Sequence, residues 1–294
     1  MGFDDINPYR MGNFEEIKEK LSTSNDQDIY YQKWMKNYSE MFKAGNDLDI
    51  IDWKVREWRA IKEIYASSIL YNESKIALAN RCISSYYFSA YYSIFHAMLS
   101  AICLDTNITL DKISNINHSK VGNQFKNTYC HGKNSILSED IYTFFNHSKY
   151  LREYYSYIPP LNMTFYESSY IENLEKFIVQ CFQLTNLQSL ILERSNKHGR
   201  SRIMKTQEQC SHVFESFYKL TSKPNLNNRY VLDSADINVR DDILRYGIDF
   251  QFIVLQLDHT FDEFRTYNGS SEFFSEDNAV VGSEIYSFIY DSLV

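Results

Sequence analysis

Arginine, histidine, lysine and tyrosine residues in the middle of the sequence have side chains of the kinds that bind phosphate groups. An arginine can hold a phosphate with its planar guanidinium, and a tyrosine hydroxyl can donate a hydrogen bond to a phosphate oxygen. A histidine beside a lysine, or a histidine in a glycine-containing loop, can contact the same kind of ligand. We therefore take as candidate ligand residues Arg152, Tyr157, His118, Lys120 and His131.

Each of these residues also has a purely structural interpretation. Arg152 could be an ion-paired surface arginine at a helix end, and His118 could be a packed histidine at the start of a helix. The many aromatic residues could stack on bases, but most recur at helical spacing and fit a core. We name no residue as catalytic on the sequence alone.

Patterns for metal-dependent and nucleophilic catalysis are missing from the sequence. His118, His131 and His147 are spaced by 13 and 16 residues, and no H-x(3)-H or H-E-x-x-H pair occurs. Cys210 and His212 are two residues apart, which places them poorly for sharing a ligand on a helix. No G-x-S-x-G motif marks a serine hydrolase. We expect neither a metal nor a cofactor.

A basic segment, residues 194–205, is the strongest indication of a binding surface in the sequence. It could hold phosphates or an acidic partner surface, or it could be a solvated loop between helices. Six acidic residues follow within residues 258–277 and could bind this segment inside the molecule, or could bind a neighbouring molecule. The basic residues are Arg194, Lys197, Arg200, Arg202 and Lys205, and the acidic residues are Asp258, Asp262, Glu263, Glu272, Glu276 and Asp277.

A run without formal charge, residues 82–104, is long enough to span a bilayer, but it carries polar residues on one side. This arrangement favours a central packing helix of a bundle or dimer over a membrane span, and we expect His96 to form an interior hydrogen bond. We assign the small polar stripe to a homodimer interface. Its members recur at spacings of 4, 4, 3 and 4: Ser85, Ser89, Ser93, His96 and Ser100.

The composition predicts the helices that must position these side chains. The chain has 9 Gly and 4 Pro in 294 residues, whereas average usage gives about 20 and about 15. This shortage argues against turn-rich β-folds and excludes glycine-rich phosphate loops. The net charge of −8 argues against a uniformly basic nucleic-acid binder. Five scattered cysteines and a charged N-terminal segment predict a cytoplasmic protein.

Helical periodicity and its interruptions predict an all-α chain with three parts. Residues 1–48 form an N-terminal helical extension, residues 49–195 an antiparallel bundle of four or five helices, and residues 196–294 a second helical module. In the bundle we expect a helix over 49–71, a break at 72–74 and a helix from about 75 to 104. In the last module we expect helices over about 206–221, 238–266 and 282–292.

Three groups of residues resemble a known family. Residues 89–97 read Ser-Ala-Tyr-Tyr-Ser-Ile-Phe-His-Ala, and residues 117–121 read Asn-His-Ser-Lys-Val and precede Phe125. Residues 151–155 read Leu-Arg-Glu-Tyr-Tyr. In this order they are similar to three parts of the HEPN superfamily: its central YYAxFHA helix, its H-x-x-V-x-x-x-F helix and its arginine before A-D-Y. The resemblance covers residues 75–160 and implies a helical nucleotide-binding domain that dimerises, as in bacterial toxins, CRISPR nucleases and abortive-infection proteins.

The sequence departs from this family at the nuclease motif. HEPN ribonucleases carry R-x(4–6)-H, and two copies meet across a dimer to form a metal-independent site. After Arg152, the permitted histidine positions hold Tyr157, Ile158 and Pro159. A tyrosine with a pKa of about 10 is a poor base at neutral pH. The resemblance therefore implies a cytoplasmic defence, toxin–antitoxin or stress protein that binds RNA, a nucleotide or a protein partner encoded nearby, without the standard site.

Two alternatives remain open at this stage. The first is an endoribonuclease with a rearranged site at a homodimer interface. It would use Arg152, Tyr157 and either His118 or His131 of the partner chain. The second is an interaction scaffold that does not bind nucleic acid. In none of the three cases do we expect a membrane-bound protein.

Overall fold

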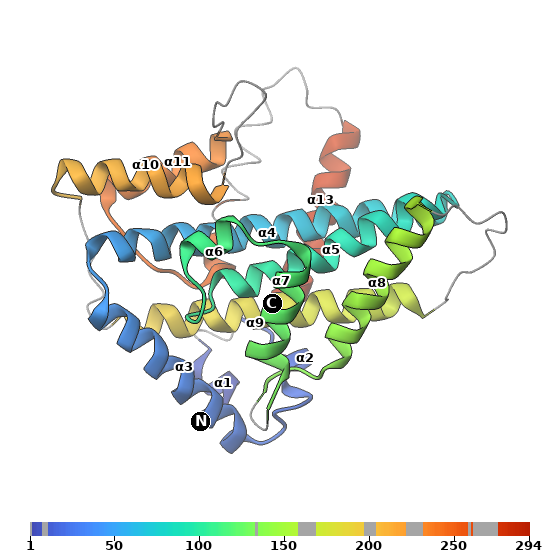
Figure 1. The fold of residues 1–294 in the computed structure, drawn as a ribbon, viewed down its shortest axis with the longest axis horizontal. Helices are drawn as coiled ribbons and strands as arrows, with labels where there is room; N and C mark the ends of the chain where they lie inside the picture. Colours follow the sequence, from blue (N-terminus) through green and yellow to red (C-terminus); the bar gives the residue numbers. More distant parts are fainter. Residues whose placement is uncertain are drawn as a thin grey trace.

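The computed structural model describes residues 2–7, 11–132, 135–157, 169–196, 204–221, 232–257, 260 and 276–294, the side chains of 276–282 excepted. In these residues every regular element is a helix and no β-strand occurs. The predicted all-α fold is therefore confirmed. Figure 1 shows long helices gathered around a central pair.

The central pair is a hairpin of helices α4 (Asp47–Ala79) and α5 (Ile83–Cys103). Asn46 caps α4 by accepting the backbone N–H groups of Leu48 and Asp49. The predicted break at residues 72–74 is wrong, because α4 continues through it. Ser74 is buried there and donates to the Tyr71 carbonyl at 2.7 Å. The turn comes later, where Arg81 has a positive φ of 58°.

Helix α5 lies at the centre of the bundle. It packs on α4, on α7 (His118–Phe125), on α8 (Asp140–Tyr157) and on α9 (Tyr170–Ser195). A short helix, α6 (Leu110–Ser114), and a π-helical segment, Lys126–Cys130, complete this region. The central position confirms the packing role expected for residues 82–104. None of the described helices combines the length and the hydropathy needed to cross a bilayer.

A buried arginine closes the C-terminal end of α5. The Arg56 guanidinium donates to the carbonyls of Cys103 at 2.8 Å, Asp105 at 2.7 Å and Ile108 at 3.0 Å. Its Cζ lies 3.7 Å from the centroid of the Trp53 ring. The last carbonyls of a helix, here that of Cys103, have no partner within the helix. Arg56 supplies a donor to this carbonyl and to two carbonyls of the segment that follows α5.

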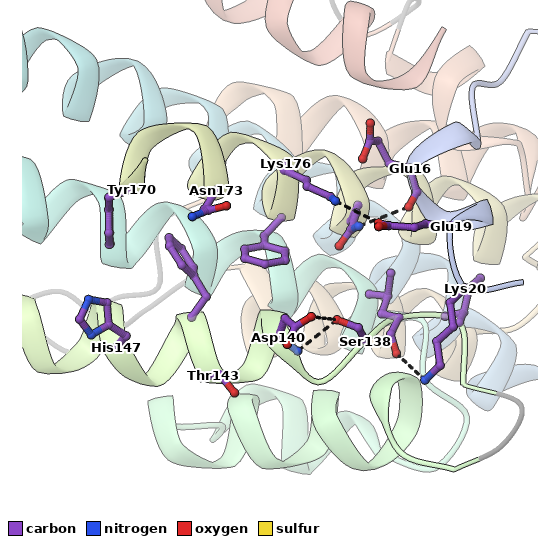
Figure 2. Close-up of a pocket in the computed structure, with 15 residues that line it drawn as sticks. Glu16, Glu19, Lys20, Ser138, Asp140, Thr143, His147, Tyr170, Asn173 and Lys176 are labelled. Carbon is purple, nitrogen blue, oxygen red and sulfur yellow. Dashed lines mark hydrogen bonds and ion pairs between the residues drawn. The ribbon is translucent and has the colours of Figure 1, made fainter. Parts of the chain in front are cut away.

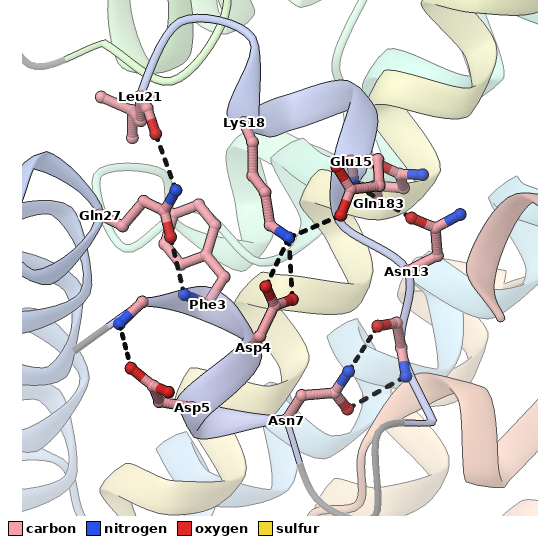
Figure 3. Close-up of polar contacts among 12 residues, drawn as sticks. Phe3, Asp4, Asp5, Asn7, Asn13, Glu15, Lys18, Leu21, Gln27 and Gln183 are labelled. Carbon is pink, nitrogen blue, oxygen red and sulfur yellow. Dashed lines mark hydrogen bonds and ion pairs between the residues drawn. The ribbon is translucent and has the colours of Figure 1, made fainter. Parts of the chain in front are cut away.

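The N-terminal segment folds onto α9. It contains α1 (Phe3–Ile6), α2 (Glu15–Lys18) and α3 (Ser24–Ala44). Figure 3 shows Gln27 of α3 accepting the Phe3 N–H at 2.9 Å and donating to the Leu21 carbonyl at 2.8 Å. Lys18 forms ion pairs with Asp4 and Glu15 in the same view. These contacts hold the short helix α1 on the body of the protein.

Three C-terminal helices lie against the central hairpin and α9. They are α10 (Gln207–Thr221), α11 (Ser234–Tyr246) and α13 (Glu276–Leu293). Helix α10 packs on α4, and α13 packs on α4 and α9. The helix predicted over 238–266 is wrong in its bounds, because α11 ends at Tyr246 and Gly247 has a φ of 92°, in the left-handed region that favours glycine.

The three predicted parts share one hydrophobic core. A continuous cluster of buried side chains includes Phe3 of the N-terminal segment, the bundle residues and Leu293 of α13. The divisions at residues 48/49 and 195/196 therefore separate stretches of sequence that pack around the same interior.

Candidate phosphate-binding site

Two adjacent tyrosines of α5 form a platform for Arg152 of α8. The Arg152 Cζ lies 4.8 Å from the ring centroid of Tyr91 and 5.8 Å from that of Tyr92. The Arg152 Nη1 donates to the Tyr92 hydroxyl at 3.4 Å. A guanidinium over aromatic rings is attracted to them electrostatically and keeps its planar donors at the ring edge. The arginine is thus held in one orientation.

Arg152 keeps unused hydrogen-bonding capacity in this position. Its Nη2 lies 3.1 Å from Glu153 Oε1, and the Glu153 side chain is 46% exposed. The Arg152 Nε is buried and has no hydrogen-bond acceptor among the described residues. An exposed ion pair contributes little to stability, so an anionic ligand can replace Glu153 at small cost.

A second buried donor lies beside Arg152. Burial raises the pKa of the Tyr91 hydroxyl well above its ordinary value, although the charge of Arg152 lowers it. Tyr91 therefore remains a neutral donor at physiological pH. Its oxygen also has no hydrogen-bond partner among the described residues. Two such donors, one of them charged, favour an acceptor-rich ligand such as a phosphate.

His118 reaches the same two tyrosines from α7. Its ring centroid lies 5.4 Å from that of Tyr92 and 5.6 Å from that of Tyr91. Phe95 is closer still, at 4.5 Å. Gly122 lets α7 lie close to α8, because a Cβ there would lie 2.8 Å from the Phe145 ring of α8. The structure thus brings together two candidates, Arg152 and His118, that are 34 positions apart in the sequence.

Two other candidates point away from this pair. Tyr157 is 74% exposed and lies five residues after Arg152 on α8, about 140° around the helix. Lys120 is exposed and lies two residues after His118, about 160° around α7. Neither therefore shares a face with the residue it was expected to assist.

His131 lies at the opposite end of α8. Its Nδ1 is 3.4 Å from Glu139 Oε1, and Glu139 also pairs with Lys126 at 2.8 Å. Glu139 precedes Arg152 by 13 residues, a rise of about 20 Å along a helix. Within one chain His131 does not join Arg152.

The small polar stripe of α5 faces helices of its own chain. Ser93 donates to the Ser67 carbonyl of α4 at 2.8 Å, and the hydroxyl oxygens of Ser100 and Thr185 of α9 are 2.8 Å apart. Both serines are fully buried in the single chain, while Ser85 is exposed. The dimer role expected for Ser85, Ser89, Ser93, His96 and Ser100 is therefore corrected, because α4 and α9 cover most of this stripe.

His96 is the fourth member of the stripe, and its Nδ1 contacts the Glu63 carboxylate of α4 at hydrogen-bonding distance. Arg59 pairs with the other oxygen of the same carboxylate. Glu63 is 2% exposed, so its charge is balanced from two sides by residues of the same hairpin. His96 acts at this seam of α4 and α5.

The basic segment is described only at its two ends. Arg194 is exposed in the last turn of α9, and Lys205 is exposed just before α10. The other three basic residues, Lys197, Arg200 and Arg202, lie outside the described residues. The side chains of the acidic stretch, Asp258, Asp262, Glu263, Glu272, Glu276 and Asp277, also lie outside them.

A pocket that the sequence analysis missed lies between α8, α9 and the N-terminal segment (Figure 2). Its volume is about 690 Å³. One face of α8 supplies Asp140, Thr143, Phe144 and His147, which are spaced i, i+3, i+4 and i+7. This spacing marks a shared helix face and could have been recognised in the sequence.

We also searched for a metal-binding cluster and for known relatives of this chain. Among the described residues, no group of three or more His, Cys, Asp or Glu is placed to hold a metal ion. Comparisons with protein-family models, curated proteins and solved structures found no match. The protein is a helical bundle of the all-α class, and its HEPN resemblance stays a prediction.

Proposed function

We propose that this chain is a HEPN-like protein of a bacterial defence, toxin–antitoxin or stress system. It binds RNA through a phosphate held by Arg152, without the standard R-x(4–6)-H nuclease site. One observation carries the proposal: Arg152 and His118, from two separate motifs of the resemblance, pack on the same pair of tyrosines.

The electrostatics support a local and salt-dependent contact. The chain has a net charge of −8, so a phosphate is attracted by this cluster and repelled by most of the remaining surface. Arg152 offers a planar donor set on a fixed platform, and Tyr91 offers a neutral hydroxyl. A single phosphate contact predicts weak binding that falls as salt rises.

Binding of a labelled single-stranded RNA, followed by fluorescence anisotropy at low salt, tests the proposal. We expect Arg152→Ala to weaken binding by about tenfold or more, because it removes a charge-assisted contact. Arg152→Lys keeps the charge, so we expect its RNA affinity to lie between those of the wild type and Arg152→Ala. The matched control is Arg245→Ala, which removes an exposed arginine from α11. Equal affinities of the wild type and folded Arg152→Ala would contradict the proposal.

The same cluster favours a second function, a ribonuclease with a rearranged site. His118 contacts the same two tyrosines as Arg152 and could transfer a proton while the arginine holds the phosphate. Incubation of the purified protein with RNA in EDTA distinguishes the two functions. Cleavage that His118→Ala abolishes would support the nuclease, whereas binding without cleavage supports the first proposal. Absence of RNA binding by the wild type at low salt would favour an interaction scaffold.

A further inference from the structure

The pocket between α8 and α9 is separate from the Arg152 cluster. Neither Arg152 nor His118 lines it, and the pocket opens along the faces of the two helices (Figure 2). Its volume of about 690 Å³ is within the range of small-molecule sites, which are typically about 300–1,000 Å³.

Aromatic rings form the floor of this pocket. The centroid of the Phe144 ring lies 4.9 Å from that of Tyr170 and 5.1 Å from that of Phe177. Ile136 and Leu137 extend the apolar surface toward the start of α8. A ligand with an aromatic or large apolar side chain can bury that group on these rings.

The N-terminal segment closes one end of the pocket. The Glu16 N–H donates to Gln183 Oε1 of α9 at 2.9 Å, and Glu19 pairs with Lys176 of α9 at 3.0 Å. On the other side, Lys20 Nζ donates to the Leu137 carbonyl at 3.1 Å. This end wall therefore connects α9 to the loop before α8.

Unpaired charges of both signs line this closed end. The Lys20 ammonium donates to a carbonyl and to the Ser135 hydroxyl, and no carboxylate pairs with it among the described residues. The Asp140 carboxylate accepts from the Ser138 hydroxyl at 2.8 Å, with no cation beside it in the same part of the chain. Lys20 and Asp140 flank Ser138 in Figure 2.

We propose that this pocket binds a free α-amino acid with an aromatic or large apolar side chain. The ammonium group is held by Asp140, the carboxylate by Lys20, and the side chain lies on Phe144 and Phe177. Both charges of the ligand find an unpaired partner of opposite sign at one end, and its apolar part finds the ring floor. The free Asp140 carboxylate disfavours a phosphate, so this site extends beyond the RNA contact proposed above.

Calorimetric titration with four small probes tests this assignment. L-Phenylalanine carries all three recognised groups, phenethylamine lacks the carboxylate, 3-phenylpropionate lacks the ammonium, and glycine lacks the side chain. We expect L-phenylalanine to bind at least about tenfold more tightly than each of the others, since each one loses a contact. Equal binding of all four, or no binding of L-phenylalanine, would overturn the proposal.

Two substitutions test which residue binds the carboxylate of the ligand and which binds its ammonium group. Lys20→Met should abolish the preference for L-phenylalanine over phenethylamine, and Asp140→Asn should reduce its preference over 3-phenylpropionate. Each variant serves as a second test if the other fails to fold. Lys36→Met removes an exposed lysine from α3 and should leave all affinities unchanged.

The two proposed sites are tested separately. Arg152→Ala should keep L-phenylalanine binding, so failure of the RNA proposal leaves this one open to its own test. Loss of L-phenylalanine binding in that variant, or in Lys36→Met, would show that the pocket is not the binding site.

Discussion

Glu63 shows how one buried charge is made stable in this protein. Burial by itself would raise the pKa of the Glu63 carboxyl, but the charges of Arg59 and His96 hold it below its ordinary value of 4.5. Arg59 also donates to the Leu220 carbonyl of α10 at 2.6 Å. The carboxylate therefore links the central hairpin to a C-terminal helix through its arginine.

The lowered pKa of Glu63 predicts that Glu63→Gln destabilises the fold by an amount that depends on pH. A carboxyl whose pKa is lower in the folded chain stabilises it above pH 4.5, and that contribution is lost as the pH falls toward the folded pKa. We expect the substitution to lower the free energy of unfolding by about 3 kcal/mol at neutral pH, and by less below pH 4.5. Urea denaturation at several pH values measures the difference.

The matched control for this change is Glu40→Gln. Glu40 lies on α3, pairs with Lys36 at 3.8 Å and is 63% exposed, so its ion pair should contribute little at any pH. If Glu63→Gln lowered the free energy of unfolding by the same amount from neutral pH to pH 3, the assignment of a lowered pKa to Glu63 would be contradicted.

At the level of single residues, sequence analysis found part of the site. Arg152 and His118 were chosen for their chemistry, and the structure places both on the Tyr91–Tyr92 platform. Tyr157 and Lys120 were chosen for the same reason, but they occupy other faces of their helices. Side-chain type is local, whereas the partner of a side chain depends on how helices are rotated against one another.

At the level of elements, the seam between α4 and α5 depends on small residues. Ser67 and Ser93 meet there, with their hydroxyl oxygens 3.3 Å apart, and both are fully buried. Small side chains let the two helix backbones approach closely, and the serine hydroxyls satisfy each other and the backbone. Ser93 of the polar stripe is thus part of the interior of a single chain.

We expect Ser93→Leu to destabilise the fold and to leave its oligomeric state unchanged. A larger side chain in this filled seam overpacks it, at a cost of about 1–3 kcal/mol. Ser85→Leu lies on the same stripe but in an exposed position, so it should change stability by less than about 0.5 kcal/mol. Urea denaturation and size-exclusion chromatography measure the two properties. A change of oligomeric state in folded Ser93→Leu would instead support the original dimer assignment.

At the level of the whole molecule, the two ends of the described chain meet on α9. Gln183 is 1% exposed and accepts the Glu16 N–H at 2.9 Å, while its Nε2 donates to the Ser292 carbonyl at 3.3 Å. The Asn13 N–H also donates to the Leu293 carbonyl at 2.6 Å. One glutamine side chain thus joins the N-terminal segment and α13 to the bundle, and Figure 3 shows it beside Glu15.

Gln183→Leu should loosen both segments together. The change removes one buried and one partly buried hydrogen bond and leaves their backbone partners without the glutamine, so we expect a loss of about 2 kcal/mol in unfolding free energy. Hydrogen exchange should quicken at the amides of residues 15–18 and of residues 288–293. The matched control is Gln32→Leu on the exposed face of α3. Faster exchange in only one of the two segments would show that Gln183 does not join them.

The sequence by itself determined the fold class of this protein, the central position of residues 83–103 and the chemical types of the candidate ligands. These properties follow from composition and helical periodicity, which are local. Packing between distant segments decided the rest: Ser93 against Ser67, Arg152 on Tyr91, and Lys20 on the Leu137 carbonyl. Each of these contacts joins residues at least 26 positions apart, and no short-range pattern specifies such a pairing.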